Sequence, residues 1–230
     1  MTSLPQNKSA QIIVISPHPD DETLGCGGTI LKHSAVGDTI HWLIVTGMTE
    51  KQGFSPQVIT QRQKEIESVA QMYDFETVHN LSLPTTRLDA IPLGDIINGI
   101  SKVLLEVKSH IVYLPNRSDV HSDHRIIFNA AWSCCKTFRF PFILRVLMYE
   151  VLSETDFAPA LPETSFLPNI FSDISPYMER KIEIMREYRD EMREHPFPRS
   201  EQNIRSLATV RGATAGVEYA EAFMLLREVF

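Results

Sequence analysis

Short apolar runs alternate with longer segments of helical periodicity along the first 150 residues. The runs Gln11–Ser16, Thr39–Thr46 and His110–Leu114 are almost continuously apolar, which is typical of strands buried on both faces of a parallel sheet. Ser55–Tyr73 and Gly94–Lys108 instead carry their apolar residues at helical spacing. This alternation predicts an α/β fold with a mostly parallel sheet flanked by helices.

The rest of the chain continues the pattern until proline becomes dense. The segment Glu154–Pro176 contains Pro159, Pro162, Pro168 and Pro176, which predicts a loop or an excursion at the sheet edge. No second apolar core follows it, so we expect a single domain. The pattern further predicts helices over Thr23–Ala35, His121–Thr137, Tyr177–Glu194 and Glu218–Val229, and strands over Val78–Leu83 and Phe142–Val151.

Composition and charge exclude several classes of protein. Hydrophobic residues make up 43% of the chain and charged residues 22%, close to globular averages, so disorder is not expected. The formal net charge of -7 argues against a protein that binds nucleic acid through a basic face.

The cysteines and the N-terminal segment indicate the cellular compartment of the protein. The three cysteines include the adjacent pair Cys134 and Cys135, which cannot form a disulfide framework and fit a reducing environment. Met1–Gln11 is polar, and no run approaches the roughly 18 apolar residues that a membrane span requires. We therefore expect a cytoplasmic protein without a membrane span.

Two clusters of histidine and aspartate follow two of the predicted strands. Ser16–Glu22 comes directly after the first strand, and His121–His124 comes shortly after the strand that ends at Leu114. In open α/β sheets, ligands bind outside the carboxyl ends of strands, so the clusters can meet. Their side chains supply three ligands for Zn²⁺ or a similar divalent ion such as Fe²⁺, with one position open for water: His18, Asp21 and His124.

Two further side chains in these clusters suit hydrolysis. Asp20 stands beside the ligand set and is the candidate base for the proton of an attacking water. His121 lies three residues before His124, so on a helix both share a face, and His121 can stabilise developing negative charge.

Each of these residues also has a structural interpretation. Asp20 or Asp21 alone is compatible with an N-cap of the following helix. The nearby Gly25-Cys26-Gly27-Gly28 lacks the GxGxxG pattern of a phosphate-binding turn, so close packing of the helix against the sheet explains its glycines better.

The sequences PHPDDETLGCGG (residues 17–28) and HSDH (residues 121–124) resemble the two signature motifs of the PIG-L/LmbE-like N-acetylglucosaminyl deacetylases. Arg62 and Glu65 resemble the RxxE helix of that family, and the YAEAF that begins at Tyr219 resembles its C-terminal end. The resemblance covers about residues 10–227 and implies one Rossmann-like domain over residues 1–230.

The resemblance implies a metal-dependent deacetylase, zinc-dependent in this interpretation, that converts an N-acetylglucosamine-type sugar into acetate and an amino sugar. It also implies a homo-oligomer, a trimer or a hexamer. Two alternatives stay open: an amide hydrolase acting on an amino-sugar thiol conjugate, and a non-catalytic carbohydrate-binding protein. Carried over by position, the metal ligands are His18, Asp21 and His124, the base is Asp20, the oxyanion-side histidine is His121, and the residue that orients a histidine is Asp123. Arg62 matches a substrate-binding residue, with an ion pair to a helix partner as the alternative.

Two segments depart from the family pattern. Thr46–Gly53 is longer than the compact TxGExG after the second strand, and Tyr188–Glu191 (YRDE) stands where many members have a YxSQ-like pattern. Because of both departures, the resemblance does not identify the residues that contact the substrate away from the metal.

Overall fold

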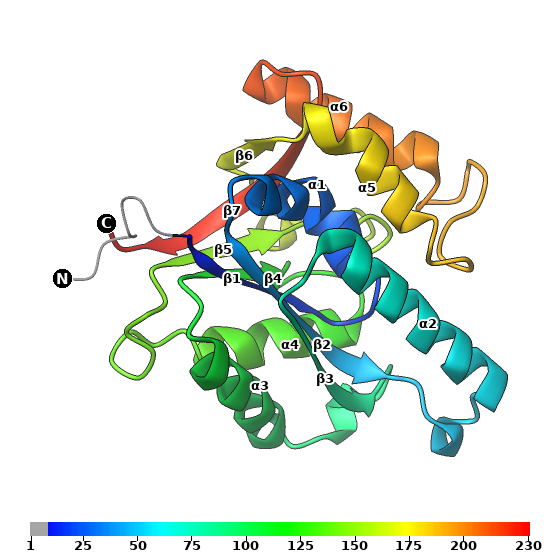
Figure 1. Ribbon diagram of the computed structural model, residues 1–230, viewed down its shortest axis with the longest axis vertical. Coiled ribbons are helices and arrows are strands. Elements are labelled where there is room, and N and C mark those ends of the chain that lie inside the picture. The colour runs from blue at the N-terminus through cyan, green and yellow to red at the C-terminus, as the bar shows by residue number, and fades with distance from the viewer. Residues whose placement is uncertain (1–8) are drawn as a thin grey trace.

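The computed structural model describes residues 9–230, which form a seven-stranded sheet between two layers of helices (Figure 1). The strand order is β3-β2-β1-β4-β5-β7-β6; the first five are parallel, and β7 pairs antiparallel with both β5 and β6. This confirms the predicted α/β class. The strands are β1 Gln11–Ser16, β2 Thr39–Gly47, β3 Thr77–Pro84, β4 Ile111–Pro115, β5 Arg145–Tyr149, β6 Ile170–Asp173 and β7 Ala220–Glu228, and the helices are α1 Asp21–Ala35, α2 Pro56–Tyr73, α3 Leu93–Val107, α4 Ser122–Ser133, α5 Met178–Met185 and α6 Glu201–Ala215.

The sequence of β1 is continuously apolar because this strand lies in the interior of the sheet. Successive side chains of a strand point to opposite faces, and in β1 both faces are covered. Ile12 and Val14 belong to a core shared with α1, α2, α5 and α6, whereas Ile13 and Ile15 belong to a core shared with α3 and α4. All four side chains are fully buried.

The order of the strands places the ends of β1 and β4 next to each other. The chain moves outward from β1 through β2 to β3, crosses back, and adds β4 on the other side of β1 with Ile12 beside Ile111. This reversal is the switch point at which doubly wound sheets bind their ligands. The segments after β1 and β4 therefore lie at the same end of the sheet.

Helix α1 packs closely against its neighbours, as its glycines predict. A Cβ on Gly25 would collide with the Tyr149 ring, and one on Gly28 would lie 2.6 Å from the Ile174 side chain. No larger residue fits at either position without displacing its neighbour.

The prediction of a terminal helix over Glu218–Val229 is wrong, because this segment forms strand β7. Its alanine, glutamate, methionine and leucine residues are good helix formers, which is why local propensity favours a helix. Pairing with β5 on one side and β6 on the other outweighs that preference.

Three other elements differ from the predictions or make them more specific. The helix expected over Tyr177–Glu194 ends at Met185, because the following turns place Tyr188 and Glu191 against α1 and α2. The Pro-rich segment Glu154–Pro176 contains the short strand β6. Helix α6 was not predicted; it begins where the Ser200 hydroxyl accepts the Asn203 N–H at 3.2 Å.

None of the helices in residues 9–230 combines the length and apolar character that crossing a membrane requires. The expectation of a polar N-terminal segment rests partly on Met1–Lys8. These residues lie outside the described part of the chain.

Candidate metal centre and active site

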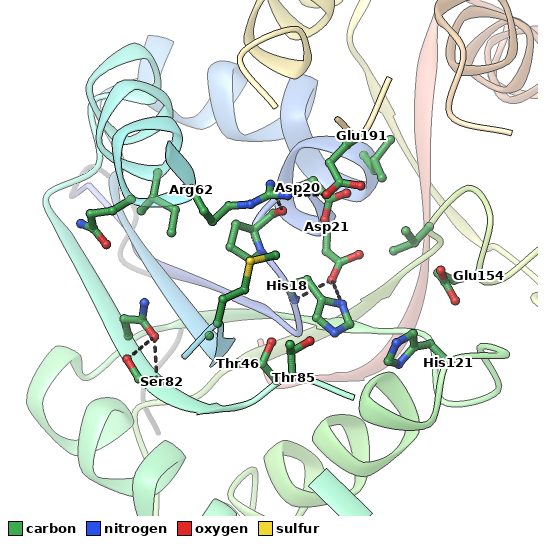
Figure 2. Close-up of a pocket in the computed structure, with 18 of the residues that line it drawn as sticks. His18, Asp20, Asp21, Thr46, Arg62, Ser82, Thr85, His121, Glu154 and Glu191 are labelled. Carbon is green, nitrogen blue, oxygen red and sulfur yellow. Dashed lines mark hydrogen bonds and ion pairs between the residues drawn. The ribbon is translucent and has the colours of Figure 1, made fainter. Parts of the chain in front are cut away.

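The two predicted clusters meet at the carboxyl ends of β1 and β4. His18 follows β1 in a loop stiffened by Pro17 and Pro19, and its backbone N–H donates to Asp21 Oδ2 at 2.8 Å. The same oxygen lies 3.4 Å from His18 Nδ1 and 3.4 Å from His124 Nε2. Figure 2 shows His18 and Asp21 facing each other across the loop.

A carboxylate stands behind each of the two histidines. His18 Nε2 donates to Asp123 Oδ2 at 3.2 Å, and His124 Nδ1 donates to Asp119 Oδ2 at 2.8 Å. These hydrogen bonds assign the proton of each ring to the nitrogen on the carboxylate side. In the neutral rings that bind a metal, the other nitrogens, His18 Nδ1 and His124 Nε2, are unprotonated and face Asp21 with their lone pairs.

The donor atoms of His18, Asp21 and His124 fit a divalent ion. They all lie within 4.8 Å of one another. A tetrahedral ion with ligands at about 2.0–2.2 Å keeps neighbouring ligand atoms about 3.4 Å apart, the separation found here between Asp21 and each histidine.

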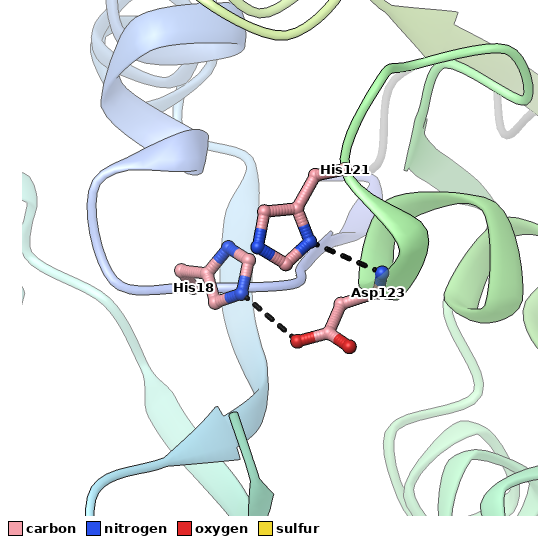
Figure 3. Close-up of side chains that lie close together, drawn as sticks. All are labelled: His18, His121 and Asp123. Carbon is pink, nitrogen blue, oxygen red and sulfur yellow. Dashed lines mark hydrogen bonds and ion pairs between the residues drawn. The ribbon is translucent and has the colours of Figure 1, made fainter. Parts of the chain in front are cut away.

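A second group, His18, His121 and Asp123, is also compact (Figure 3). Its acceptor atoms are already engaged, because the Asp123 carboxylate accepts the Thr86 N–H at 2.7 Å as well as the His18 ring. His121 Nδ1 accepts the Asp123 N–H at 3.1 Å. The first group is therefore the better candidate metal site.

The pKa values around the candidate site favour positive charge. Burial works to lower the pKa of His18, but the Asp123 and Asp21 carboxylates outweigh it and raise this pKa to about 9. For His124, burial is likewise outweighed, and Asp21 and Asp119 raise the pKa well above its usual value. Burial works to raise the pKa of Asp21, but the two imidazoles hold it well below its usual value. Without an ion, these shifts favour a second proton on each ring, and a cation bound by the neutral rings would replace those protons in the same stabilising field.

Asp20 occupies the N-cap position directly before α1, but its side chain does not cap the helix. Its backbone has φ of 129°, a region that residues other than glycine rarely adopt, and its side chain accepts no capping hydrogen bond. The backbone N–H is held by Glu22 Oε2 at 3.0 Å. Burial, followed by the charge of Asp21, raises the pKa of Asp20 well above its usual value. Without an ion the carboxyl therefore favours its protonated form, and a divalent cation beside it would favour the carboxylate that a base requires.

His121 precedes α4 and presents a proton donor to the same cavity. Because its Nδ1 accepts the Asp123 N–H, the neutral ring carries its proton on Nε2. Burial and the nearby His18 and His124 lower the pKa of His121 to about 4, which keeps the ring neutral near pH 7.

A cavity of about 380 Å³ opens beside these residues. His18, Asp20, Asp21 and His121 line one end of it, and it extends between α2 and the end of β3 (Figure 2). This volume is within the range of pockets that hold small molecules. The surrounding walls mix apolar and polar side chains, among them Met48, Ile59, Ile66, Asn80, Ser82 and Glu154.

Arg62, predicted to bind substrate, lies in the cavity wall and is paired within the protein. It contacts Glu65 at 3.4 Å and forms a hydrogen-bonded ion pair with Glu191. Glu191 in turn accepts Arg199 Nη2 at 2.7 Å. The ion pairs fix the guanidinium group at the wall and balance its charge.

Sequence reasoning missed three residues that support the site. Asp119 could have been found, since it precedes His124 by five positions in the loop after a buried strand. Glu191 lies in the segment Tyr188–Glu191 that departs from the family pattern, and Arg199 lies in the loop His195–Ser200, which resembles a loop of some family members. Neither signal shows that Glu191 pairs with both Arg62 and Arg199.

The fold and this geometry define a doubly wound α/β protein with a candidate metal centre at its switch point. A family model described as GlcNAc-PI de-N-acetylase (PIG-L) matches residues 13–135, more than half of the 230 residues. The chain belongs to this family of deacetylases, which confirms the resemblance seen in its motifs.

Individual relatives extend the similarity along nearly the whole chain. Diacetylchitobiose deacetylase from Thermococcus kodakarensis is 25% identical over 98% of this chain and 86% of its own. The solved structure of N,N'-diacetylchitobiose deacetylase from Pyrococcus horikoshii has a TM-score of 0.76 and 23% identity, covering 95% of this chain and 84% of that one. GalB, the 4-carboxy-2-hydroxymuconate hydratase from Pseudomonas putida, has a TM-score of 0.71 and 18% identity, covering 97% and 98%.

Proposed function

We propose that this protein is a metal-dependent N-deacetylase that removes the acetyl group of an N-acetylglucosamine-type sugar, giving acetate and an amino sugar. The observation that carries the proposal is the convergence of donor atoms from His18, Asp21 and His124 on one point. Asp20 and His121 line the cavity beside that point. The two diacetylchitobiose deacetylases among the relatives support an acetylated sugar as the substrate.

His18, Asp21 and His124 would hold the ion, with zinc as the proposed metal and ferrous iron acceptable to the same ligands. When bound, a divalent ion polarises a carbonyl and lowers the pKa of its bound water to about 7. Asp119 and Asp123 keep the two ligand histidines in the required tautomers through their hydrogen bonds.

The other residues of the site move protons and stabilise charge. Asp20 accepts the proton of the attacking water and passes it to the departing nitrogen, so that the C–N bond breaks and a neutral amine leaves. His121 Nε2–H donates to the carbonyl oxygen while negative charge develops on it. Acetate and the amino sugar are the balanced products of this addition of water.

The reaction is assigned from the site because the fold alone does not fix it. The hydratase GalB has the same fold at 18% identity, and one fold commonly carries several reactions. A free carboxyl beside a three-ligand cation site is what hydrolysis of an amide needs, whereas binding a sugar requires neither.

The experiment is a metal analysis combined with an acetate assay on the purified protein. We expect about one divalent ion per chain and acetate release from N-acetylglucosamine compounds, lost on chelation and restored by zinc. Release of acyl groups from an amino-sugar thiol conjugate alone would favour the other amide hydrolase. Absence of any hydrolysis by metal-loaded protein would contradict the proposal and favour a binding protein.

We also propose that the protein works in the cytoplasm. The three cysteines are buried free thiols, which fits a reducing compartment. The trimer or hexamer that the family resemblance implies stays a prediction.

A further inference from the structure

Glu154 is a carboxylate on the cavity wall that the proposed reaction does not use. It follows β5 and lines the cavity together with His121, on the side opposite Arg62 in the view of Figure 2. Its side chain is half-buried, and its Oε1 accepts a hydrogen bond from the Ser153 hydroxyl at 3.4 Å. Within residues 9–230 no lysine, arginine or histidine forms an ion pair with it.

The backbone around Glu154 is held firmly at the site. The Glu154 carbonyl accepts the Val120 N–H at 3.0 Å, immediately before His121. Ser153 has φ of 73° and accepts Arg199 Nη1 at 3.0 Å, which stabilises this turn. The carboxylate is therefore anchored beside the reacting end of the cavity rather than placed on a free loop.

The positive charges of the cavity wall are already balanced. Arg62 is paired with Glu65 and Glu191, and Arg199 is paired with Glu191. A divalent ion at the candidate site would face the carboxylates of Asp20 and Asp21. Glu154 forms no ion pair, so it adds negative charge to a wall whose arginines are already paired.

The surroundings of Glu154 also disfavour its own negative charge. Burial raises the pKa of the Glu154 carboxyl above its usual value; Asp21 and Asp119 add to this, and His124 and His18 oppose it. A hydroxyl or ammonium donor that binds there would relieve this cost, whereas a phosphate or carboxylate would increase it.

We propose that Glu154 is a specificity-determining residue that selects hydroxylated or amine-bearing saccharides and rejects phosphorylated ones. The inference rests on the proposed deacetylase function and narrows its substrate class. It removes nucleotide-linked and other phosphate-linked sugars from the candidates and keeps neutral monosaccharides and oligosaccharides. Glu154 lines the cavity outside the candidate ligand group, so its charge should act mainly on substrate discrimination rather than on the reacting carbonyl.

The test compares kcat/KM for N-acetylglucosamine with the values for its 1-phosphate and its 6-phosphate. For wild type we expect a preference of about tenfold or more for the neutral sugar over both phosphates. In Glu154→Gln, which keeps the shape and removes the charge, this preference should fall at least about threefold, and in Glu154→Lys at least about tenfold. Glu163→Gln, which removes an exposed carboxylate away from the cavity, should retain the wild-type ratio.

Metal content and thermal unfolding are measured for every variant. An unchanged ratio in a folded, metal-loaded Glu154→Gln protein would overturn the inference while acetate release by wild type keeps the proposed function intact. Loss of metal in Glu154→Gln would also overturn it, because Glu154 would then act on the ion. If metal-loaded wild type releases acetate from none of the sugars, the proposed function itself fails and this inference falls with it.

Discussion

Two clusters of buried charge contact helix α1, one at its N-terminus and one on its flank. On the flank, Lys181 and Glu221 form an ion pair of 2.7 Å with side chains 4% and 5% exposed. Glu221 accepts the N–H groups of Gly28 and Thr29, each at 2.8 Å, and Lys181 donates to the Leu24 carbonyl at 2.9 Å. Each charged group in this cluster therefore has its partners inside the chain.

The N-terminal cluster is built differently. Asp119 and Asp123 bind the outer nitrogens of His124 and His18, and the inner nitrogens face Asp21 with their lone pairs. In the neutral rings, these three acceptors converge on one point where a single cation would satisfy all of them, whereas the flank supplies its own ammonium group. The comparison shows that the direction of the lone pairs, more than burial of charge, distinguishes a site from a structural ion pair.

Removal of a ligand should have the largest effect. In His124→Ala the set falls to two ligands, so we expect loss of stoichiometric metal and, with it, essentially all acetate release. Metal analysis after dialysis measures the first effect, and the acetate assay measures the second. His110→Ala, which removes a histidine outside the ligand set, should keep its metal; full metal content in His124→Ala would mean that the ligand set is misassigned.

Substitution of the base should reduce turnover without removing the ion. For Asp20→Asn we expect kcat to fall by about 10²- to 10⁴-fold, because the amide cannot accept the proton of water. Metal content should remain near one ion per chain, since the donor group does not include Asp20. Full activity in this variant would refute the assignment of the base.

Disruption of the flank cluster should affect stability and spare the metal. Lys181→Met leaves Glu221 buried without its ammonium partner, which should cost about 3–5 kcal/mol of unfolding free energy. Denaturant unfolding measures the loss, and the exposed pair Arg180 and Glu183 supplies the control, because Arg180→Met should change stability by less than about 1 kcal/mol. A stable Lys181→Met protein that loses its ion would contradict the division between the clusters.

A smaller effect is expected from the carboxylate behind His124. Asp119→Asn keeps the shape but weakens the hydrogen bond to Nδ1, so metal affinity should fall about 10- to 100-fold while the protein still folds. Competition with a chelator of known affinity measures this change. An affinity equal to that of wild type would show that Asp119 does not orient the ligand.

How much the sequence predicts depends on how local the determining contacts are. The strands around β1 and the meeting of the two histidine–aspartate clusters could be predicted, because their apolar runs, prolines and motifs lie next to one another in the chain. Strand β7 could not, since its helix-forming residues become a strand only through pairing with β5 and β6. Arg62 lines the cavity and pairs with Glu65 of its own helix, a contact that local reasoning can reach, but its other partner Glu191 lies 129 positions away and local reasoning could not identify it.

The most direct test of the account is a crystal structure of the protein loaded with zinc, with anomalous diffraction data collected at the zinc edge. The account predicts one ion within about 2.0–2.2 Å of His18 Nδ1, a carboxylate oxygen of Asp21 and His124 Nε2. An ion held instead by His121 and Asp123, or zinc found only at the protein surface, would contradict it.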